Sequence, residues 1–294
     1  MAQGSHQLQE IHALRLDSHQ HFWRYNPAEY PWIPKNSALH RDWLPTDWQK
    51  AARPCGVGGC VAVQARQTLD ETQWLLELAE HHPFIKAVVG WVDLRSDHVE
   101  AQLAKFASHP KFAGVRHVVQ DEPDDSFMLR PDFLSGIGRL KQFNLCYDIL
   151  IFPKQLPAAI ELVALFPEQQ FVLDHLAKPL IKDRRLSPWQ EQLRELAKAP
   201  NVCCKVSGLI TEAEHGAWQN NDFRPYMDVA FEAFGEDRLL FGSDWPVCLL
   251  SGSYAQVVEL LDNYLSGFDQ ITREKIWGGN TARIYDPRVI SPAA

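Results

Sequence analysis

Residues 14–23 read LRLDSHQHFW, and the fold prediction starts from this stretch. Its alternating apolar residues predict a β-strand. Side chains two positions apart in a strand point to the same face, so His19 and His21 are expected to project together, with Asp17 below them. Two adjacent imidazoles suit a divalent metal, a water or a developing oxyanion. The alternative is a pair of surface histidines at a strand end, and the rest of the chain decides between the two.

Short apolar strands alternate with amphipathic helices along the rest of the sequence. Alternation of this kind predicts parallel βαβ units, and eight units in about 250 residues match a closed (β/α)8 TIM barrel of the α/β class. An open doubly wound sheet is less well supported, because no GxGxxG motif follows a strand. We predict one barrel domain over residues 14–294, after a polar N-terminal tail at residues 1–13. The further strands are expected at residues 58–65, 86–94, 112–119, 144–152, 170–175, 201–208 and 238–244.

Composition excludes several classes of protein. The 294-residue chain has a formal charge of -8, whereas nucleic-acid binding requires a basic face. No apolar run approaches the ~20 residues that span a membrane, and the N-terminus lacks the apolar core of a signal peptide. The six cysteines form no CxxC pair, which is typical of buried free thiols in a reducing compartment. We therefore expect a cytoplasmic protein without nucleic-acid or membrane partners, and homo-oligomerisation stays open.

Polar side chains collect where the predicted strands end. In a barrel these ends open on one face, where barrel enzymes place their chemistry. Structural alternatives stay open for some of these residues and for Asp174, which precedes His175: Lys205 can pair with a carboxylate on the barrel floor, Asp174 can face the helices, and only one of Tyr147 and Asp148 needs to reach the site. The strand-end set comprises His19, His21, Gln64, Arg66, Asp93, Arg116, His117, Tyr147, Asp148, His175, Lys205, Ser207 and Asp244.

Three motifs together resemble the amidohydrolase superfamily: HQH at 19–21, LDHLAKP at 173–179 and FGSDWP at 241–246. More narrowly, the chain resembles the lactonases that open sugar lactones such as fuconolactone or rhamnonolactone, a branch related to the 2-pyrone-4,6-dicarboxylate lactonases. The resemblance implies that His19 and His21 are the family's strand-one pair. By the same resemblance, His175 is the strand-six histidine and Asp244 the strand-eight aspartate.

The same resemblance leads to an expectation about metal. Metal-dependent members carry a strand-five histidine or carboxylated lysine, where this chain has Tyr147 and Asp148. A zinc ion would then be held by His19, His21 and Asp244, with His175 optional; three protein ligands and a water make a catalytic zinc site. Because one ligand is lost, and because the similar pyrone lactonases work without metal, we expect a divalent metal to be optional, not strictly required.

Hydrolysis of a lactone, a cyclic ester, needs an activated water and an acid for the departing oxygen. Asp244 is expected to take the proton of the water. The strand-one histidines, directly or through a metal, would stabilise the oxyanion, with Arg116 assisting or holding a hydroxyl. Tyr147 or His175 would protonate the leaving oxygen. The expected catalytic residues are Asp244, His19, His21, His175, Arg116 and Tyr147, and the expected substrate contacts are Gln64, Arg66, Trp32, His117 and Lys205.

The expected partner is a small-molecule lactone. Strand ends offer only Arg66, Arg116 and Lys205 as cations, too few for a dicarboxylate, since carboxylates favour bidentate arginine. The aromatic segment at 22–45, including Trp32, is expected to form an ordered lid suited to a neutral sugar ring, with plain surface packing as the alternative. Three other functions stay open: a 2-pyrone-4,6-dicarboxylate lactonase, a metal-dependent amidohydrolase or decarboxylase of the superfamily, and a non-catalytic sugar-binding protein.

Overall fold

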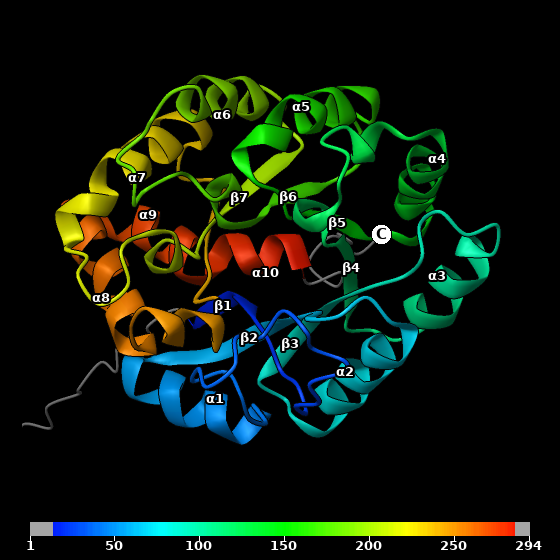
Figure 1. Cartoon of the computed structure of the whole chain (residues 1–294), viewed down its shortest axis with the longest axis horizontal. Coiled ribbons are helices and arrows are strands. Elements are labelled where there is room, and N and C mark those ends of the chain that lie inside the picture. Colours follow the sequence, from blue (N-terminus) through cyan, green and yellow to red (C-terminus); the bar gives the residue numbers. More distant parts are fainter. Residues whose placement is uncertain (1–13, 286–294) are drawn as a thin grey trace, which may run out of the picture.

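A closed parallel barrel forms the centre of the structure, a computed structural model that describes residues 14–285 (Figure 1). Each strand pairs in parallel with the next along the chain, which confirms the predicted (β/α)8 barrel. The predicted tail at residues 1–13 lies outside the described residues. The strands are β1 (Arg15–Gln20), β2 (Val57–Val63), β3 (Ile85–Gly90), β4 (Phe112–His117), β5 (Cys146–Ile149), β6 (Phe171–Leu173), β7 (Val202–Val206) and β8 (Leu239–Phe241).

Helices form a ring around the strands (Figure 1). The sequence pattern did not predict α1, because its three buried residues, Pro45, Trp48 and Ala52, are too few to establish a helical period. No helix of residues 14–285 is long and apolar enough to cross a membrane. The α-helices are α1 (Pro45–Ala52), α2 (Leu69–His81), α3 (Val99–Ala107), α4 (Pro131–Leu140), α5 (Leu156–Leu165), α6 (Trp189–Ala197), α7 (Asn220–Phe234), α8 (Tyr254–Leu265), α9 (Gln270–Glu274) and α10 (Asn280–Tyr285).

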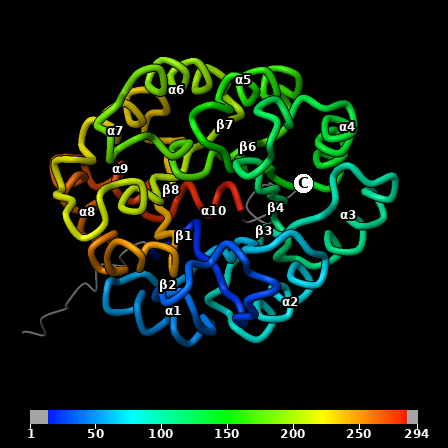
Figure 2. The backbone as a smooth tube through the Cα atoms, viewed as in Figure 1, coloured from blue at the N-terminus to red at the C-terminus, as the bar shows by residue number. Residues whose placement is uncertain are grey.

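The interior of the barrel is a small apolar core, separate from the larger layer between strands and helices. Small side chains such as Val61 and Ala87 fill it, joined by Ile284 and Tyr285 from α10. Figure 2 shows α10 lying across the middle of the barrel. The Ile284 carbonyl accepts a hydrogen bond from Cys146, the first residue of β5. Helix α10 therefore closes the N-terminal end of the barrel, and the C-terminal end stays free for the site.

The barrel closes where β1 meets the segment after β8. The Asp244 N–H donates to the His19 carbonyl at 2.8 Å, and the His21 N–H donates to Trp245 at 2.7 Å. Asp17 supports this seam by accepting hydrogen bonds from both the N–H and the hydroxyl of Ser243. Its carboxylate also binds the side chains of Trp48 on α1 and Tyr254 on α8.

Asp17 therefore faces the helices, and the expectation that it shares a face with His19 is wrong. The register of β1 against β2 shifts between Asp17 and Gln20. An irregularity of this kind breaks the two-residue alternation on which the expectation depended.

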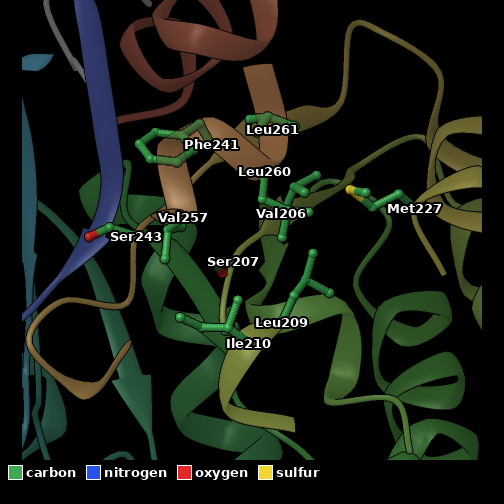
Figure 3. A pocket seen from close by; sticks show the side chains of 11 residues that line it. Val206, Ser207, Leu209, Ile210, Met227, Phe241, Ser243, Val257, Leu260 and Leu261 are labelled. Carbon is green, nitrogen blue, oxygen red and sulfur yellow. The ribbon is translucent and has the colours of Figure 1, made fainter. Parts of the chain in front are cut away.

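A small apolar void lies between β7, β8 and the helices α7 and α8. Figure 3 shows the side chains of Val206, Phe241 and Leu260 converging on it. Its volume is about 10 Å³. Because a single water needs about that much space, this void is a packing gap and not a ligand site.

Candidate active site

Three donor atoms converge at the C-terminal end of β1. His19 Nε2 lies 3.2 Å from His21 Nε2, and Asp244 Oδ1 lies 3.4 Å from His21 Nε2 and 3.8 Å from His19 Nε2. All three residues are buried. The hydrogen bonds of the barrel seam bring these atoms together, because they join the end of β1 to Asp244.

Each imidazole has a partner behind it. The Nδ1–H of His21 donates to the Val63 carbonyl at 2.8 Å, which leaves the Nε2 lone pair facing Asp244. His19 Nδ1 lies 3.3 Å from Asp174 Oδ1 and 3.1 Å from Lys205 Nζ. Burial holds the pKa of His19 well below its usual value, although the charge of Asp174 opposes this shift. His19 is therefore neutral at neutral pH.

A buried ion network supports His19 from below. Lys205 Nζ lies 2.5 Å from Asp148 Oδ2 and 2.9 Å from Asp174 Oδ1. Tyr285 of α10 donates its hydroxyl proton to Asp148. Burial lowers the pKa of Lys205, but the two carboxylates outweigh burial and raise it, so the ammonium stays charged. Lys205 thus pairs with barrel-floor carboxylates, as the alternative allowed, and Asp174 faces the barrel instead of the helices.

Arg116 and His175 complete the cluster. Arg116 Nη1 donates to Asp174 Oδ2 at 3.0 Å and lies 3.3 Å from His19 Nε2, while its Nη2 donates to the Gln64 carbonyl. His175 Nδ1 lies 2.8 Å from Ser207 Oγ. Burial lowers the pKa of His175 to about 4, so its ring is neutral at neutral pH.

Asp244 is the acceptor at the centre of the site. Burial alone would raise the pKa of its carboxyl, but the nearby imidazoles of His175, His21 and His19 outweigh burial and hold the pKa below its ordinary value. Asp244 is therefore ionised at neutral pH and is able to accept a proton or bind a cation.

A cavity of about 560 Å³ opens above this cluster. That volume lies within the roughly 300–1,000 Å³ of small-molecule sites. Trp32 and Arg66, predicted as substrate contacts, do line it. The lining also includes His21, Pro34, Gln67, Arg116, Gln120, Asp121, Glu122, His175, Lys178 and Asp244.

Lys205, a predicted substrate contact, does not line the cavity, because Asp148 and Asp174 hold it in the floor below. Three further predicted site residues also lie elsewhere. Tyr147 is fully buried, and its ring packs against Phe133 and Phe171 in the layer between strands and helices. It follows that Tyr147 does not reach the cavity, since Asp148 takes the inward position on β5. Gln64 is also fully buried, and its side-chain amide donates to the Arg116 carbonyl.

His117 likewise points away from the cavity, on the face of β4 opposite Arg116. Its Nε2 lies 2.7 Å from Glu122, and its ring stacks on Phe127. Trp91 donates to its Nδ1 at 3.3 Å. These contacts occupy both ring nitrogens and one ring face, so His117 supports the cavity wall and we do not retain it as a substrate contact.

The structure also adds residues that the strand-end set missed. Val172 on β6 faces the barrel interior, and Asp174 two residues later faces the same way. The two-residue alternation of a strand could therefore have predicted that Asp174 faces the site. Lys178 had no such signal. It ends a run of four residues with positive φ that begins at His175, and this left-handed turn brings its side chain to the cavity.

The comparisons with known proteins agree with this geometry. Residues 16–286 match the family model described as amidohydrolase. The chain belongs to the amidohydrolase family. It is 43% identical over 288 residues to an L-fucono-1,5-lactonase of Burkholderia multivorans, with 93% of this chain and 96% of that protein covered. It is 37% identical over 281 residues to an L-fucono-1,5-lactonase of Burkholderia ambifaria, with 92% and 95% covered.

Among solved structures, this amidohydrolase is similar to one from Burkholderia multivorans with bound zinc. The TM-score is 0.89 and the identity 43%, over 93% of this chain and 99% of that one. The predicted superfamily and its barrel are thus confirmed along nearly the whole described chain.

Proposed function

We propose that this amidohydrolase hydrolyses a neutral sugar-acid lactone, with L-fucono-1,5-lactone as the first substrate to test. The proposal rests on an ionised, buried Asp244 beside two imidazoles at the floor of a cavity of small-molecule size. The relatives named as L-fucono-1,5-lactonases support the substrate class.

The charges of the cavity favour a neutral substrate. Each of its three cations already has a carboxylate partner. Arg66 pairs with Glu29 at 2.6 Å, and Arg116 pairs with Asp174 at 3.0 Å. Lys178 lies 4.0 Å from Glu212. Because Asp121 and Glu122 also line the cavity, no surplus positive charge is left for a dicarboxylate, and the carboxylate product of lactone opening is repelled.

The residues suggest how water would be activated. Asp244 accepts a proton from a water placed against the lactone carbonyl, as a general base does. Arg116 Nη1 lies 3.3 Å from His19 Nε2, the nitrogen on the side of Asp244, whereas Lys205 Nζ lies 3.1 Å from Nδ1 on the other side of the ring. The N–H groups of Arg116 are placed to stabilise negative charge that develops on the carbonyl oxygen. Trp32 and Arg66 line the outer wall, where the sugar ring would lie.

The donor set also suits a divalent cation. A tetrahedral zinc site places its ligand atoms roughly 3.3 Å apart, and the three donor atoms lie 3.2–3.8 Å apart. The Val63 carbonyl contacts His21 Nδ1 and the Asp174 carboxylate contacts His19 Nδ1. Metal-binding histidines usually have such a partner at the ring nitrogen that does not bind the metal. Arg116 and a cation are alternative partners of His19 Nε2.

The charge of the buried cluster supports the same conclusion. Three carboxylates, those of Asp148, Asp174 and Asp244, face the two cations Lys205 and Arg116. One negative charge is left over, so His19, His21 and Asp244 would hold a cation. The geometry thus favours a resident metal over the optional one expected from the sequence. Such a cation supplies charge that polarises an ester carbonyl and acidifies water.

The test is acid release from a panel of lactones. The purified protein is assayed with five- and six-membered aldonolactones, simple alkyl lactones and 2-pyrone-4,6-dicarboxylate, using a pH indicator at neutral pH. The proposal predicts turnover of aldonolactones and little or none of the dicarboxylate. Absence of turnover with every neutral lactone contradicts it.

A further inference from the structure

Opening a lactone requires a proton for the departing ring oxygen, and neither donor expected from the sequence can give one. Tyr147 lies outside the cavity, packed between Phe133 and Phe171. His175 Nε2 lies 3.8 Å from Asp244 Oδ1, and its Nδ1 lies 2.8 Å from Ser207 Oγ. Both ring nitrogens therefore face groups of the protein, so the donor has to be another residue.

Lys178 is placed for this role. It lines the cavity together with Asp244 and His175, and its side chain is only 18% exposed. Among residues 14–285, its carboxylate partner is Glu212, loosely paired at 4.0 Å, and its ammonium lies 5.4 Å from the ring of Phe152. No short ion pair within this part of the chain holds the ammonium, so it is able to move toward a substrate.

The backbone at Lys178 is unusual. Residues 175–178 all have φ between 52° and 57°, a left-handed conformation that L-residues other than glycine rarely adopt. Runs of this kind persist where the surroundings enforce them, and they cluster at functional sites. Here the turn closes with a hydrogen bond from the Lys178 N–H to the His175 carbonyl at 2.7 Å, and both side chains reach the same cavity.

The other cavity groups are unsuitable as acids. The guanidinium groups of Arg66 and Arg116 do not release protons at any relevant pH. Glu122 is engaged with His117 at 2.7 Å, and Asp244 is needed as the acceptor. Among the cavity-lining residues of the described chain, Lys178 is the sole ammonium group.

We propose that Lys178 is the catalytic acid that protonates the leaving ring oxygen, an assignment that rests on the proposed lactonase function. Water adds to the carbonyl carbon while Asp244 takes one of its protons. The bond from the carbonyl carbon to the ring oxygen then breaks, its electron pair stays on that oxygen, and the oxygen takes a proton from the Lys178 ammonium. The product is a hydroxy acid. Asp244 returns its proton through water to the Lys178 amine, and the acid releases one proton to solvent.

The first experiment compares Lys178→Met, Lys178→Arg and a matched control, Lys182→Met, in zinc-containing buffer with the best aldonolactone. Lys182 is a nearby lysine that pairs with Glu214 at 2.8 Å, with its side chain 61% exposed. Both Lys178 variants are expected to lose ~10²–10⁴-fold in kcat with little change in KM, because arginine keeps the charge but not a transferable proton. Lys182→Met is expected to keep wild-type kcat.

The second experiment separates proton donation from charge and from folding. Lys178→Ala is assayed with added ethylammonium or tetramethylammonium. Ethylammonium carries a transferable proton and is expected to restore at least about a tenth of the lost kcat, whereas tetramethylammonium restores none. Recovery of activity by a small amine also shows that the variant is folded.

Several results would overturn the assignment. One is a wild-type kcat in Lys178→Arg, which would mean that charge alone matters. Another is a loss confined to KM, which would mean a binding role, and a third is the absence of ethylammonium rescue. If the wild-type protein turns over no lactone at all, the proposed function itself fails and the assignment fails with it, so the two failures are distinguishable.

Discussion

The N–H of Asp244 donates to the carbonyl of His19 at 2.8 Å, across the seam where the barrel closes. Together with the bond from the His21 N–H to Trp245, it joins β1 to the segment after β8 and brings the central carboxylate to the two imidazoles. Asp17 reinforces it by binding Ser243, the residue before Asp244. The hydrogen bonds that close the barrel therefore also position Asp244 beside His19 and His21.

Replacing Asp244 by asparagine should remove most of the activity and leave the fold intact. The amide keeps the shape but cannot accept the proton of water, and loss of a general base typically lowers kcat ~10²–10⁴-fold. The measurement is kcat on the best lactone, with circular dichroism as the check on folding. Asp228→Asn, at an exposed aspartate, is the control. A kcat within a few-fold of wild type would exclude Asp244 as the base.

Removal of metal should lower activity. His19, His21 and Asp244 form a donor set of the size a zinc ion requires, so we expect about one divalent ion per chain after reconstitution. His21→Ala should lose that ion, whereas His98→Ala, at an exposed histidine, should keep it. Metal content and turnover are measured in parallel after dialysis against a chelator. Full activity in metal-free protein would favour the metal-independent site expected from the sequence.

The Lys205→Met variant should be strongly destabilised. It leaves Asp148 and Asp174 buried without their ammonium partner, and breaking a buried ion pair in this way costs about 3–5 kcal/mol. Urea unfolding measures the loss, with Lys86→Met at an exposed strand position as the control. Adding Asp148→Asn should recover part of the loss. A change below about 1 kcal/mol in the single variant would show that the network is dispensable.

The free energy of unfolding should depend on pH through Glu71. Its carboxylate accepts hydrogen bonds from the Ala65 and Arg66 N–H groups and from the Tyr30 hydroxyl, but burial outweighs them and raises its pKa to about 7. Between pH 4.5 and 7 the folded protein therefore keeps a proton that the unfolded chain has lost. The free energy of unfolding falls as pH rises through this window, by up to ~3 kcal/mol from this group.

The Glu71→Gln variant tests this sign. The amide keeps an acceptor and does not titrate, so the stability of the variant relative to wild type should rise from pH 4.5 to 7. The exposed Glu77→Gln on the same helix should show no such trend. A difference between variant and wild type that is constant with pH would refute the shift at Glu71.

The fold followed from the sequence because its signals are local and repeated. Each strand is a short apolar run, and most helices show the 3.6-residue spacing of apolar side chains. The shared direction of His19 and His21 at the end of β1 was predicted from the two-residue alternation of a strand. Helix α1 was missed, since its eight residues hold only three buried side chains, too few to establish a helical period. Alternation predicted opposite faces for Tyr147 and Asp148 but could not say which of the two faces inward.

The remaining site features depend on backbone geometry that alternation does not encode. A register shift in β1 turns Asp17 toward the helices while His19 faces the barrel. Four left-handed residues carry Lys178 back to the cavity. Irregularities of this kind are fixed by long-range contacts, so they follow from the folded structure and not from local patterns.

The central claim is hydrolysis of a neutral sugar lactone, and kcat/KM for L-fucono-1,5-lactone against 2-pyrone-4,6-dicarboxylate tests it most directly. Both substrates are assayed with wild-type protein and with Asp244→Asn as the background. We predict at least about 10⁴ M⁻¹s⁻¹ for the neutral lactone, in the ordinary range of enzymes on their own substrates, and a far lower value for the dicarboxylate. Preference for the dicarboxylate, or equal rates in wild type and Asp244→Asn, would contradict it.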